Sequence, residues 1–293
     1  ILIVEDNRLF SMRLREKLRE SLDLESTICC SFKETRTLLE IRPENFFLAI
    51  VDLHLPDAMK GEAIDYVLQK GLPTIVATGD FTTKTRDSII KKRILDYVIK
   101  NNRFIFSHLI STVERFLKNH CIRILIVDDS KSARFLIKEM LELHKFQTFE
   151  AENGQIALDI LKQDPEIRMV ITDNVMPEMD GFELTKQIRQ RYSKNELAVI
   201  GISSHKSGSM TANYLKNGAN DFIQKPFDIE EFYQRVIQNL ELMEYIELLK
   251  DSATKDYLTG VYNRRYFFQL GVSEFIKATE KNNPIIVSML DID

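Results

Sequence analysis

The residues best suited to chemistry occur twice along the chain, in the same order. Each set contains an acidic pair, a single aspartate, a hydroxyl residue and a lysine, and each member ends or follows a short apolar run. The first set is Glu5, Asp6, Asp52, Thr78 and Lys100. The second set is Asp128, Asp129, Asp173, Ser203 and Lys225. Corresponding members are 121 to 125 residues apart, which is the length of a domain and too long for a solenoid repeat.

Three carboxylates that lie close together repel one another and raise one another's pKa unless a cation lies among them. Ligands that offer only oxygen favour a hard cation, and Mg²⁺ fits best. The single aspartate of each set would then be a nucleophile beside a metal, which suits attack on a phosphoryl group. The lysine would neutralise phosphoryl oxygens, and the hydroxyl would donate a hydrogen bond to one of them. A hydroxyl that moves towards a phosphorylated aspartate could rearrange the neighbouring loops. Tyr97 and Phe222, three residues before each lysine, are placed to follow such a movement.

The elements that position these residues alternate between apolar runs and segments of helical periodicity. We expect strands near residues 1–4, 27–30, 47–51, 74–77 and 95–99, and again near 123–127, 147–150, 169–172, 198–202 and 220–223. Strands that alternate with helices predict an α/β fold with parallel sheets covered on both faces. Because ligands bind beyond the carboxyl ends of such strands, one edge of each sheet would gather one set.

Composition limits the class of protein. The 293 residues are 44% hydrophobic and 29% charged, with a formal net charge of −4, which argues against a nucleic-acid binder as a whole. Three cysteines without metal-ligand spacing indicate free thiols in a reducing compartment. No apolar run reaches the roughly 18 residues that span a bilayer. We therefore expect a cytoplasmic protein with no membrane and no DNA partner.

The two sets closely resemble the receiver domains of two-component response regulators, which implies two tandem flavodoxin-like (βα)5 domains. The resemblance makes Asp52 and Asp173 the phosphoacceptors, with a histidine kinase or phosphotransfer protein as donor. It assigns Mg²⁺ to the acidic residues, with Asp6 and Asp129 as direct ligands. The main-chain carbonyls of His54 and Val175 would complete the two metal sites.

The two copies differ. The second has Gly218-Ala219 and Lys225-Pro226, as the family does, whereas the first has Arg93-Ile94 and Lys100-Asn101 at the matching positions. One copy of a tandem pair can be an adaptor that only packs or dimerises. Our hypothesis is that both accept phosphate and that Asp173 is the more conventional site.

A long helix is predicted from Asp228 to about residue 252, because no Gly or Pro interrupts its apolar stripe. It either packs along its whole length on the second receiver or projects and pairs with a twin in a homodimer. We expect domains at 1–120 and 121–240, with the last helix continuing as a linker to about 254, and a third segment at 255–293.

That third segment resembles the start of a GGDEF domain, the catalytic domain of diguanylate cyclases. The motif is Asp256-x-Leu-Thr-Gly-x-x-Asn-Arg-Arg-x-Phe267, followed by an apolar strand at 285–290 and by Asp291-Ile292-Asp293. The resemblance makes Asp291 a metal ligand together with the carbonyl of Ile292. It assigns Asp256–Phe267 to structural coupling, and the catalytic hairpin would follow Asp293.

The expected function is a phosphorylation-dependent response regulator that controls a cyclase making cyclic di-GMP from two GTP. The parent protein would be the enzyme, and the present chain lacks the catalytic motif. One alternative is a degenerate GGDEF domain that senses a nucleotide without catalysis. Another is a phosphate relay or sink whose last domain docks a partner.

Overall fold

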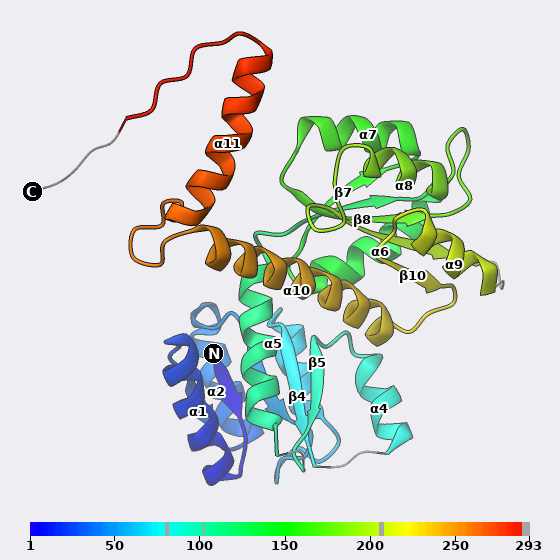
Figure 1. Cartoon of the computed structure of the whole chain (residues 1–293). Helices are drawn as coiled ribbons and strands as arrows, with labels where there is room; N and C mark the ends of the chain where they lie inside the picture. The colour runs from blue at the N-terminus through cyan, green and yellow to red at the C-terminus, as the bar shows by residue number, and fades with distance from the viewer. Residues whose placement is uncertain (80–81, 102, 205–207, 289–293) are drawn as a thin grey trace, which may run out of the picture. The chain divides into compact units, whose positions relative to one another are not determined.

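A computed structural model describes residues 1–79, 82–101, 103–204 and 208–288 (Figure 1). It contains two five-stranded parallel sheets with strand orders β2-β1-β3-β4-β5 and β7-β6-β8-β9-β10. Both follow the 2-1-3-4-5 order of flavodoxin-like proteins, which confirms the predicted fold class. The chain divides into two compact units, Ile1–Ile167 and Arg168–Asp293, and this division falls at the start of β8.

The first sheet consists of β1 (Leu2–Val4), β2 (Thr27–Cys29), β3 (Ala49–Asp52), β4 (Thr74–Thr78) and β5 (Asp96–Ile99). Its helices are α1 (Arg8–Leu22), α2 (Phe32–Ile41), α3 (Glu62–Gln69), α4 (Thr83–Ile90) and α5 (Ile105–Asn119), with a short 3₁₀ turn at Pro43–Asn45. Each strand lies within two residues of its predicted position, because a buried parallel strand shows as a continuous apolar run.

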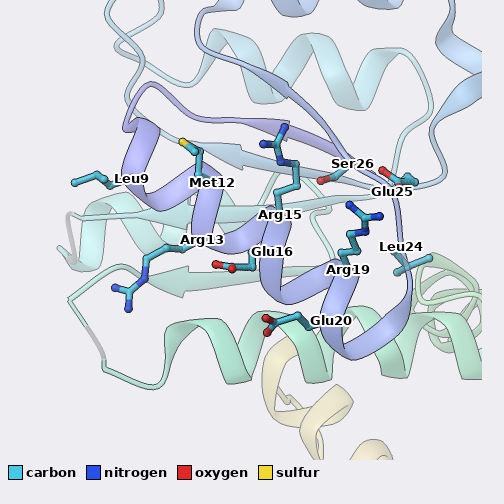
Figure 2. Close-up of a pocket in the computed structure, with 10 residues that line it drawn as sticks. All are labelled: Leu9, Met12, Arg13, Arg15, Glu16, Arg19, Glu20, Leu24, Glu25 and Ser26. Atoms are coloured by element: carbon cyan, nitrogen blue, oxygen red, sulfur yellow. The ribbon is translucent and has the colours of Figure 1, made fainter.

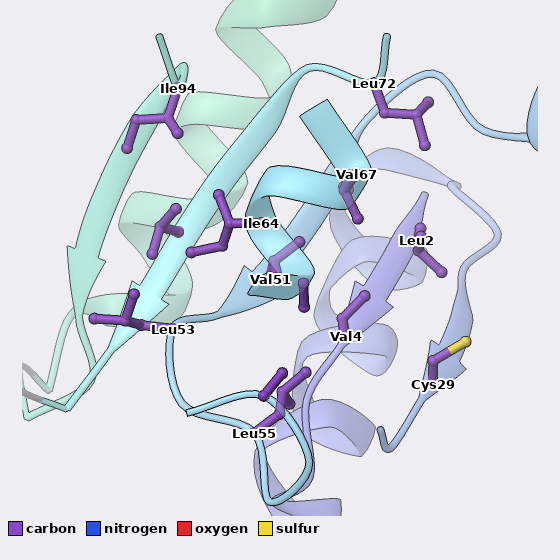
Figure 3. Packing of buried hydrophobic residues seen from close by; sticks show 14 of the residues in the cluster. Leu2, Val4, Cys29, Val51, Leu53, Leu55, Ile64, Val67, Leu72 and Ile94 are labelled. Carbon is purple, nitrogen blue, oxygen red and sulfur yellow. The ribbon is translucent and has the colours of Figure 1, made fainter. Parts of the chain in front are cut away.

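Alternation along the strands of the first sheet builds a core on each face. Leu2, Val51 and Val76 belong to a cluster with residues of α2, α3 and α4, part of which Figure 3 shows. Ile3 and Ile50 belong to a second cluster with residues of α1 and α5. Neighbouring strand residues therefore enter opposite cores, as the period of two requires.

The second sheet consists of β6 (Arg123–Val127), β7 (Gln147–Ala151), β8 (Ile167–Asp173), β9 (Ala198–Ser203) and β10 (Asp221–Gln224). The helices that follow these strands are α6 (Lys131–Leu143), α7 (Gly154–Gln163), α8 (Gly181–Arg189), α9 (Gly208–Lys216) and α10 (Ile229–Thr254). The last helix is α11 (Arg264–Glu280).

The turn before the last strand of each sheet explains one difference between the copies. Gly218 has a φ of 100°, and a Cβ built on it would lie 2.8 Å from the Arg189 side chain. Arg93, at the matching place in the first sheet, has a φ of 56°. The same left-handed backbone thus forms without glycine, at a cost of about 1 kcal/mol.

The long helix α10 has two different environments. Its first half packs on the second sheet, where Phe232, Val236 and Leu240 are buried. In the second half, Leu249 of the same stripe is 70% exposed. Packing of this helix on its own sheet therefore does not extend along its whole length, and pairing of the second half with a twin stays a prediction.

The segment after α10 begins as predicted and then departs from the prediction. Asn263 caps α11 by accepting a hydrogen bond from the Tyr266 amide. The prediction of a strand at 285–290 is wrong over residues 285–288, which have no regular secondary structure. Ile286, within this run, is 90% exposed. An apolar run becomes a buried strand only when neighbouring strands pair with it, and residues 283–288 have no ladder partner. Within the described ranges, no helix is long and apolar enough to cross a membrane.

The buried His144, at the C-terminus of α6, predicts a dependence of stability on pH. Burial lowers the pKa of His144 from 6.5 to about 3. Between pH 6.5 and about pH 3, the His144 imidazole therefore binds a proton in the unfolded chain but not in the folded chain. The free energy of unfolding falls as the pH falls through this window. The loss is about 1.4 kcal/mol per pH unit.

We expect the His144→Phe variant, which cannot titrate, to lack this component. Urea unfolding at pH 6.5 and pH 5 should show the native chain losing about 2 kcal/mol more than the variant. Equal losses in the two proteins would contradict a neutral, buried His144.

Candidate functional site

The two acidic pairs have the same local geometry. Each lies between the end of a strand and the N-cap of the next helix, where Asn7 caps α1 and Ser130 caps α6. The first acid of each pair is buried and accepts a hydrogen bond from the amide two residues later, Glu5 from Asn7 at 3.2 Å and Asp128 from Ser130 at 2.9 Å. The second acid of each pair is exposed.

In the first sheet, three predicted carboxylates and the predicted lysine lie together. Carboxylate oxygens of Glu5, Asp6 and Asp52 all lie within 4.8 Å of one another. The Lys100 ammonium lies 2.7 Å from Glu5 Oε2 and 2.5 Å from Asp52 Oδ2. These residues come from the ends of β1, β3 and β5, which the strand order brings to one edge. The cluster predicted from spacing therefore forms.

The charges of this cluster are largely removed from water. Glu5 is 2% exposed and Asp52 is 7% exposed. Burial raises the pKa of Glu5 above its ordinary value, and the hydrogen bond and charge of Lys100 offset only part of this shift. Two buried carboxylates around one ammonium leave an excess of negative charge, which favours a second cation in this place.

Both predicted acceptor aspartates are fixed by the loop that follows them. Asp52 Oδ1 accepts a hydrogen bond from the His54 amide at 3.3 Å, and Asp173 Oδ2 accepts one from the Val175 amide at 2.8 Å. The imidazole Nδ1 of His54 lies 2.8 Å from the Met59 carbonyl and donates to it. Each carboxylate thus keeps one oxygen on the loop and presents the other to a lysine.

In the second unit, Lys225 Nζ lies 2.6 Å from Asp173 Oδ1. Asp173 is half-buried at the end of β8, and Lys225 directly follows β10. Asp128 and Asp129 follow β6, in the part of the second sheet that belongs to the first unit. The Arg134 guanidinium donates hydrogen bonds to their main-chain carbonyls, at 2.6 Å for Asp128 and 3.3 Å for Asp129. This arginine was not singled out from the sequence, because its spacing is that of any exposed helical residue.

The hydroxyl residues end the strand next to each lysine. Thr78 and Ser203 are each 1% exposed. The Lys100 amide donates to the Thr78 carbonyl at 2.7 Å, and the Lys225 amide donates to the Ser203 carbonyl at 2.8 Å. The hydroxyl residue and the lysine are therefore tied by the backbone in both copies. Asp291 and Ile292 lie outside the described residues.

Sequence reasoning also missed Phe10. The Lys100 ammonium lies 5.2 Å from the centre of the Phe10 ring, and this ring lies 5.1 Å from that of Phe106. A cation above an aromatic face is attracted by the ring quadrupole, so Phe10 helps to hold the lysine at the cluster. Nothing in the spacing of Phe10 distinguishes it from a core residue.

A surface hollow lies along α1. Figure 2 shows its lining, which mixes arginine, glutamate and apolar side chains. The lining residues are Leu9, Met12, Arg13, Arg15, Glu16, Arg19, Glu20, Leu24, Glu25 and Ser26. None of the predicted site residues is among them, so the hollow is not the candidate site.

Comparison with known proteins identifies the family of this chain. Residues 124–237 match the model of the response regulator receiver domain family. The chain is 36% identical over 117 residues to the two-component response regulator ORR3 of Oryza sativa, covering 39% of this chain and 89% of that protein. The chain belongs to the response regulator family.

Two further comparisons extend the similarity. The chain is 38% identical over 118 residues to histidine kinase P4 of Formosa agariphila, covering 40% of this chain but only 8% of that protein. It is also similar to the crystal structure of a two-component system response regulator/GGDEF domain protein, with 38% identity and a TM-score of 0.73, covering 83% of this chain and 98% of that one. A second structure of such a protein gives 37% identity and a TM-score of 0.72, with the same coverage.

A receiver domain receives a phosphoryl group from a phosphodonor such as a histidine kinase, and it usually binds Mg²⁺ at an acidic cluster. Glu5, Asp6 and Asp52 fit that ion, because they offer convergent oxygens and no softer ligand. The exposed Asp6 would bind it most directly from the solvent side.

We expect Asp6→Asn to weaken Mg²⁺ binding at the first sheet by about tenfold or more, because an anionic ligand is lost. Titration calorimetry with Mg²⁺ measures this affinity. An Asp129→Asn background weakens binding at the second acidic pair, so that the first site is measured by itself. The exposed Glu16→Gln on α1 removes the same charge away from the cluster and should leave affinity unchanged. Equal affinities for the Asp6 and Glu16 variants would place the ion elsewhere.

Proposed function

We propose that both receivers of this response regulator accept phosphoryl groups, on Asp52 and Asp173, and that they control a diguanylate cyclase in the parent protein. The observation that carries the proposal is the aspartate–lysine pair at each sheet edge, at 2.5 Å for Asp52 and 2.6 Å for Asp173. In both, an aspartate oxygen and an ammonium converge at strand ends, where a donor can approach from solvent.

The chemistry follows from these atoms. A carboxylate oxygen of the acceptor attacks the phosphorus of a phosphohistidine, the phosphorus–nitrogen bond breaks, and the imidazole leaves as an acyl phosphate forms. The lysine exchanges its aspartate partner for a phosphoryl oxygen, so positive charge is already in place for the transferred group. The Mg²⁺ held by the acidic pair would neutralise further charge in this site.

A second step passes the signal to α10 and beyond. The exposed apolar residues of its second half are Leu242, Tyr245, Leu248 and Leu249. They follow the helical spacing of three and four residues, which suits pairing with the same helix of a second copy. A homodimer formed there would bring two output domains together.

The segment after α10 supports rigid transmission. Asn263 caps α11 with its Oδ1 and donates from Nδ2 to the Ala253 carbonyl near the end of α10, at 2.9 Å. The Asp256 carboxylate accepts hydrogen bonds from the amides of Leu258 and Thr259, which fixes the turn between the two helices. These are residues of the GGDEF-like motif, so we assign residues 255–293 to the start of such a domain, which would use GTP.

We expect acetyl phosphate with Mg²⁺ to label both acceptors, which mass spectrometry of the intact and digested protein would detect. Asp52→Asn should remove one label and Asp173→Asn the other. Lys225→Met should slow labelling of Asp173 by about a hundredfold, because a preorganised charge at the phosphoryl oxygens is lost.

Lys186→Met, at an exposed position of α8, removes the same charge away from the site and should have no effect on that rate. Labelling of Asp52 alone in the native chain would contradict the assignment of Asp173 and make the second receiver an adaptor.

For the output, we expect the natural full-length protein with Mg²⁺ and GTP to make more cyclic di-GMP when beryllofluoride, a phosphoryl mimic, is added. The physical reason is dimerisation: each of two cyclase domains would hold one GTP, and the two domains must face each other for the two nucleotides to react. Chromatographic quantification of product measures this, and the Asp52→Asn, Asp173→Asn double variant is the control that should not respond. Absence of product in every condition would reject the cyclase and leave nucleotide sensing or partner docking.

A further inference from the structure

The residue after the second acceptor is held from three directions. The Asn174 amide donates to the Ile202 carbonyl on β9 at 3.0 Å, and its carbonyl accepts from the Gly181 amide at the start of α8 at 3.0 Å. Its side-chain Oδ1 accepts a hydrogen bond from the Tyr214 hydroxyl of α9 at 3.1 Å. Asn174 is 8% exposed. The acceptor loop is therefore joined to β9, α8 and α9 at one residue.

Tyr214 reaches this position through the interior of the second unit. Its side chain is fully buried, and its ring lies 4.3 Å from the Phe182 ring and 5.2 Å from the Phe222 ring, centre to centre. Helix α9 lies beside β10, which carries Phe222 (Figure 1). The aromatic contacts fix the ring, so the position of its hydroxyl is also fixed.

Two glycines make room for this tyrosine. A Cβ on Gly201, in the middle of β9, would lie 2.4 Å from the Tyr214 ring, and a Cβ on Gly181 would lie 2.3 Å from its hydroxyl. Glycine weakens a strand interior, so its presence in β9 indicates close approach of another group. Here that group is the tyrosine ring.

The first sheet has different residues at the three matching positions. Val76, Ile89 and Leu53 correspond there to Gly201, Tyr214 and Asn174, and all three are buried in one apolar cluster. The same fold therefore closes this region with apolar side chains at these three positions. Packing alone does not require a tyrosine hydroxyl beside the acceptor loop, because a buried hydroxyl costs free energy unless it is bonded.

The hydroxyl is suited to act as a donor. Burial raises the pKa of Tyr214, and the negative charges of Asp173 and Asp180 raise it further, so the hydroxyl keeps its proton at all physiological pH values. The charge on Asp173 also acts electrostatically on this hydroxyl, and that charge changes when a phosphoryl group is added.

We propose that Tyr214 is a positioning residue of the second receiver, whose hydroxyl holds Asn174 and thereby orients Asp173 and connects it to α9. This proposal rests on the proposed function, in which Asp173 accepts a phosphoryl group. The first receiver lacks the connection, so the two receivers transmit phosphorylation by different internal contacts.

The test follows labelling of Asp173 by acetyl phosphate in the 1–293 chain with Asp52→Asn, so that a single acceptor remains. Tyr214→Phe keeps the ring and removes the hydroxyl, and it should slow labelling by about three- to tenfold, the effect of one lost hydrogen bond. Tyr66→Phe makes the same change on α3 of the first receiver and should leave the rate unaltered.

A double-mutant cycle separates positioning from general stability. Asn174→Leu introduces the residue of the first receiver, and the Tyr214→Phe, Asn174→Leu double variant leaves no unpaired buried group, so its melting temperature should recover towards that of the parent. Its labelling rate should stay as low as that of either single variant. Rates that follow the melting temperatures through all the variants would overturn the proposal and make the contact structural only.

Hydrogen exchange of α9 gives a second readout. In the parent chain, beryllofluoride should change exchange in the segment around Tyr214, and in Tyr214→Phe this change should be lost. An unaltered response together with an unaltered labelling rate would overturn the proposal while leaving Asp173 as an acceptor. Failure of the parent to be labelled at Asp173 would instead reject the proposed function on which it rests.

Discussion

Close approach of like charges at the carboxyl edge of a parallel sheet is the constraint on which the rest of the structure depends. In the first sheet, two nearly buried carboxylates share one ammonium, and a third carboxylate lies within 4.8 Å. Such a group is stable only when positive charge offsets it, so Lys100 contributes to the stability of this edge as well as to its chemistry. The strand order supplies the geometry, because it places the ends of β1 and β3 side by side and that of β5 across β4.

The two copies share an aspartate–lysine pair at this edge and differ beneath it. The acceptor, its loop amide and its lysine are arranged alike around Asp52 and Asp173. The interior next to the acceptor loop is apolar in the first sheet, whereas in the second a tyrosine hydroxyl reaches the loop through space left by two glycines. Two domains of one fold can therefore share an arrangement at the sheet edge while their interiors behind it differ.

Helix α10 connects the second sheet to α11, and its sequence serves two environments in turn. The first half is held by burial of Phe232 and its neighbours, and the second half carries exposed apolar side chains. The capped turn at Asp256 and Asn263 then joins it to α11 through side-chain hydrogen bonds to both helices. The two helices are therefore joined by hydrogen bonds and not only by the chain between them.

The sequence by itself determined the strands, the duplicated order of acidic, hydroxyl and lysine residues, and the sheet edge at which they meet. Buried parallel strands appear as apolar runs, and functional residues follow their ends, so both signals are local. The contacts of Phe10 with Lys100, of Arg134 with the second acidic pair and of Tyr214 with Asn174 were decided by the tertiary structure. Each joins residues from different elements whose types are ordinary for core or helix surface. The run at 285–288 failed as a strand for the same reason, because pairing is a property of neighbours and not of the run itself.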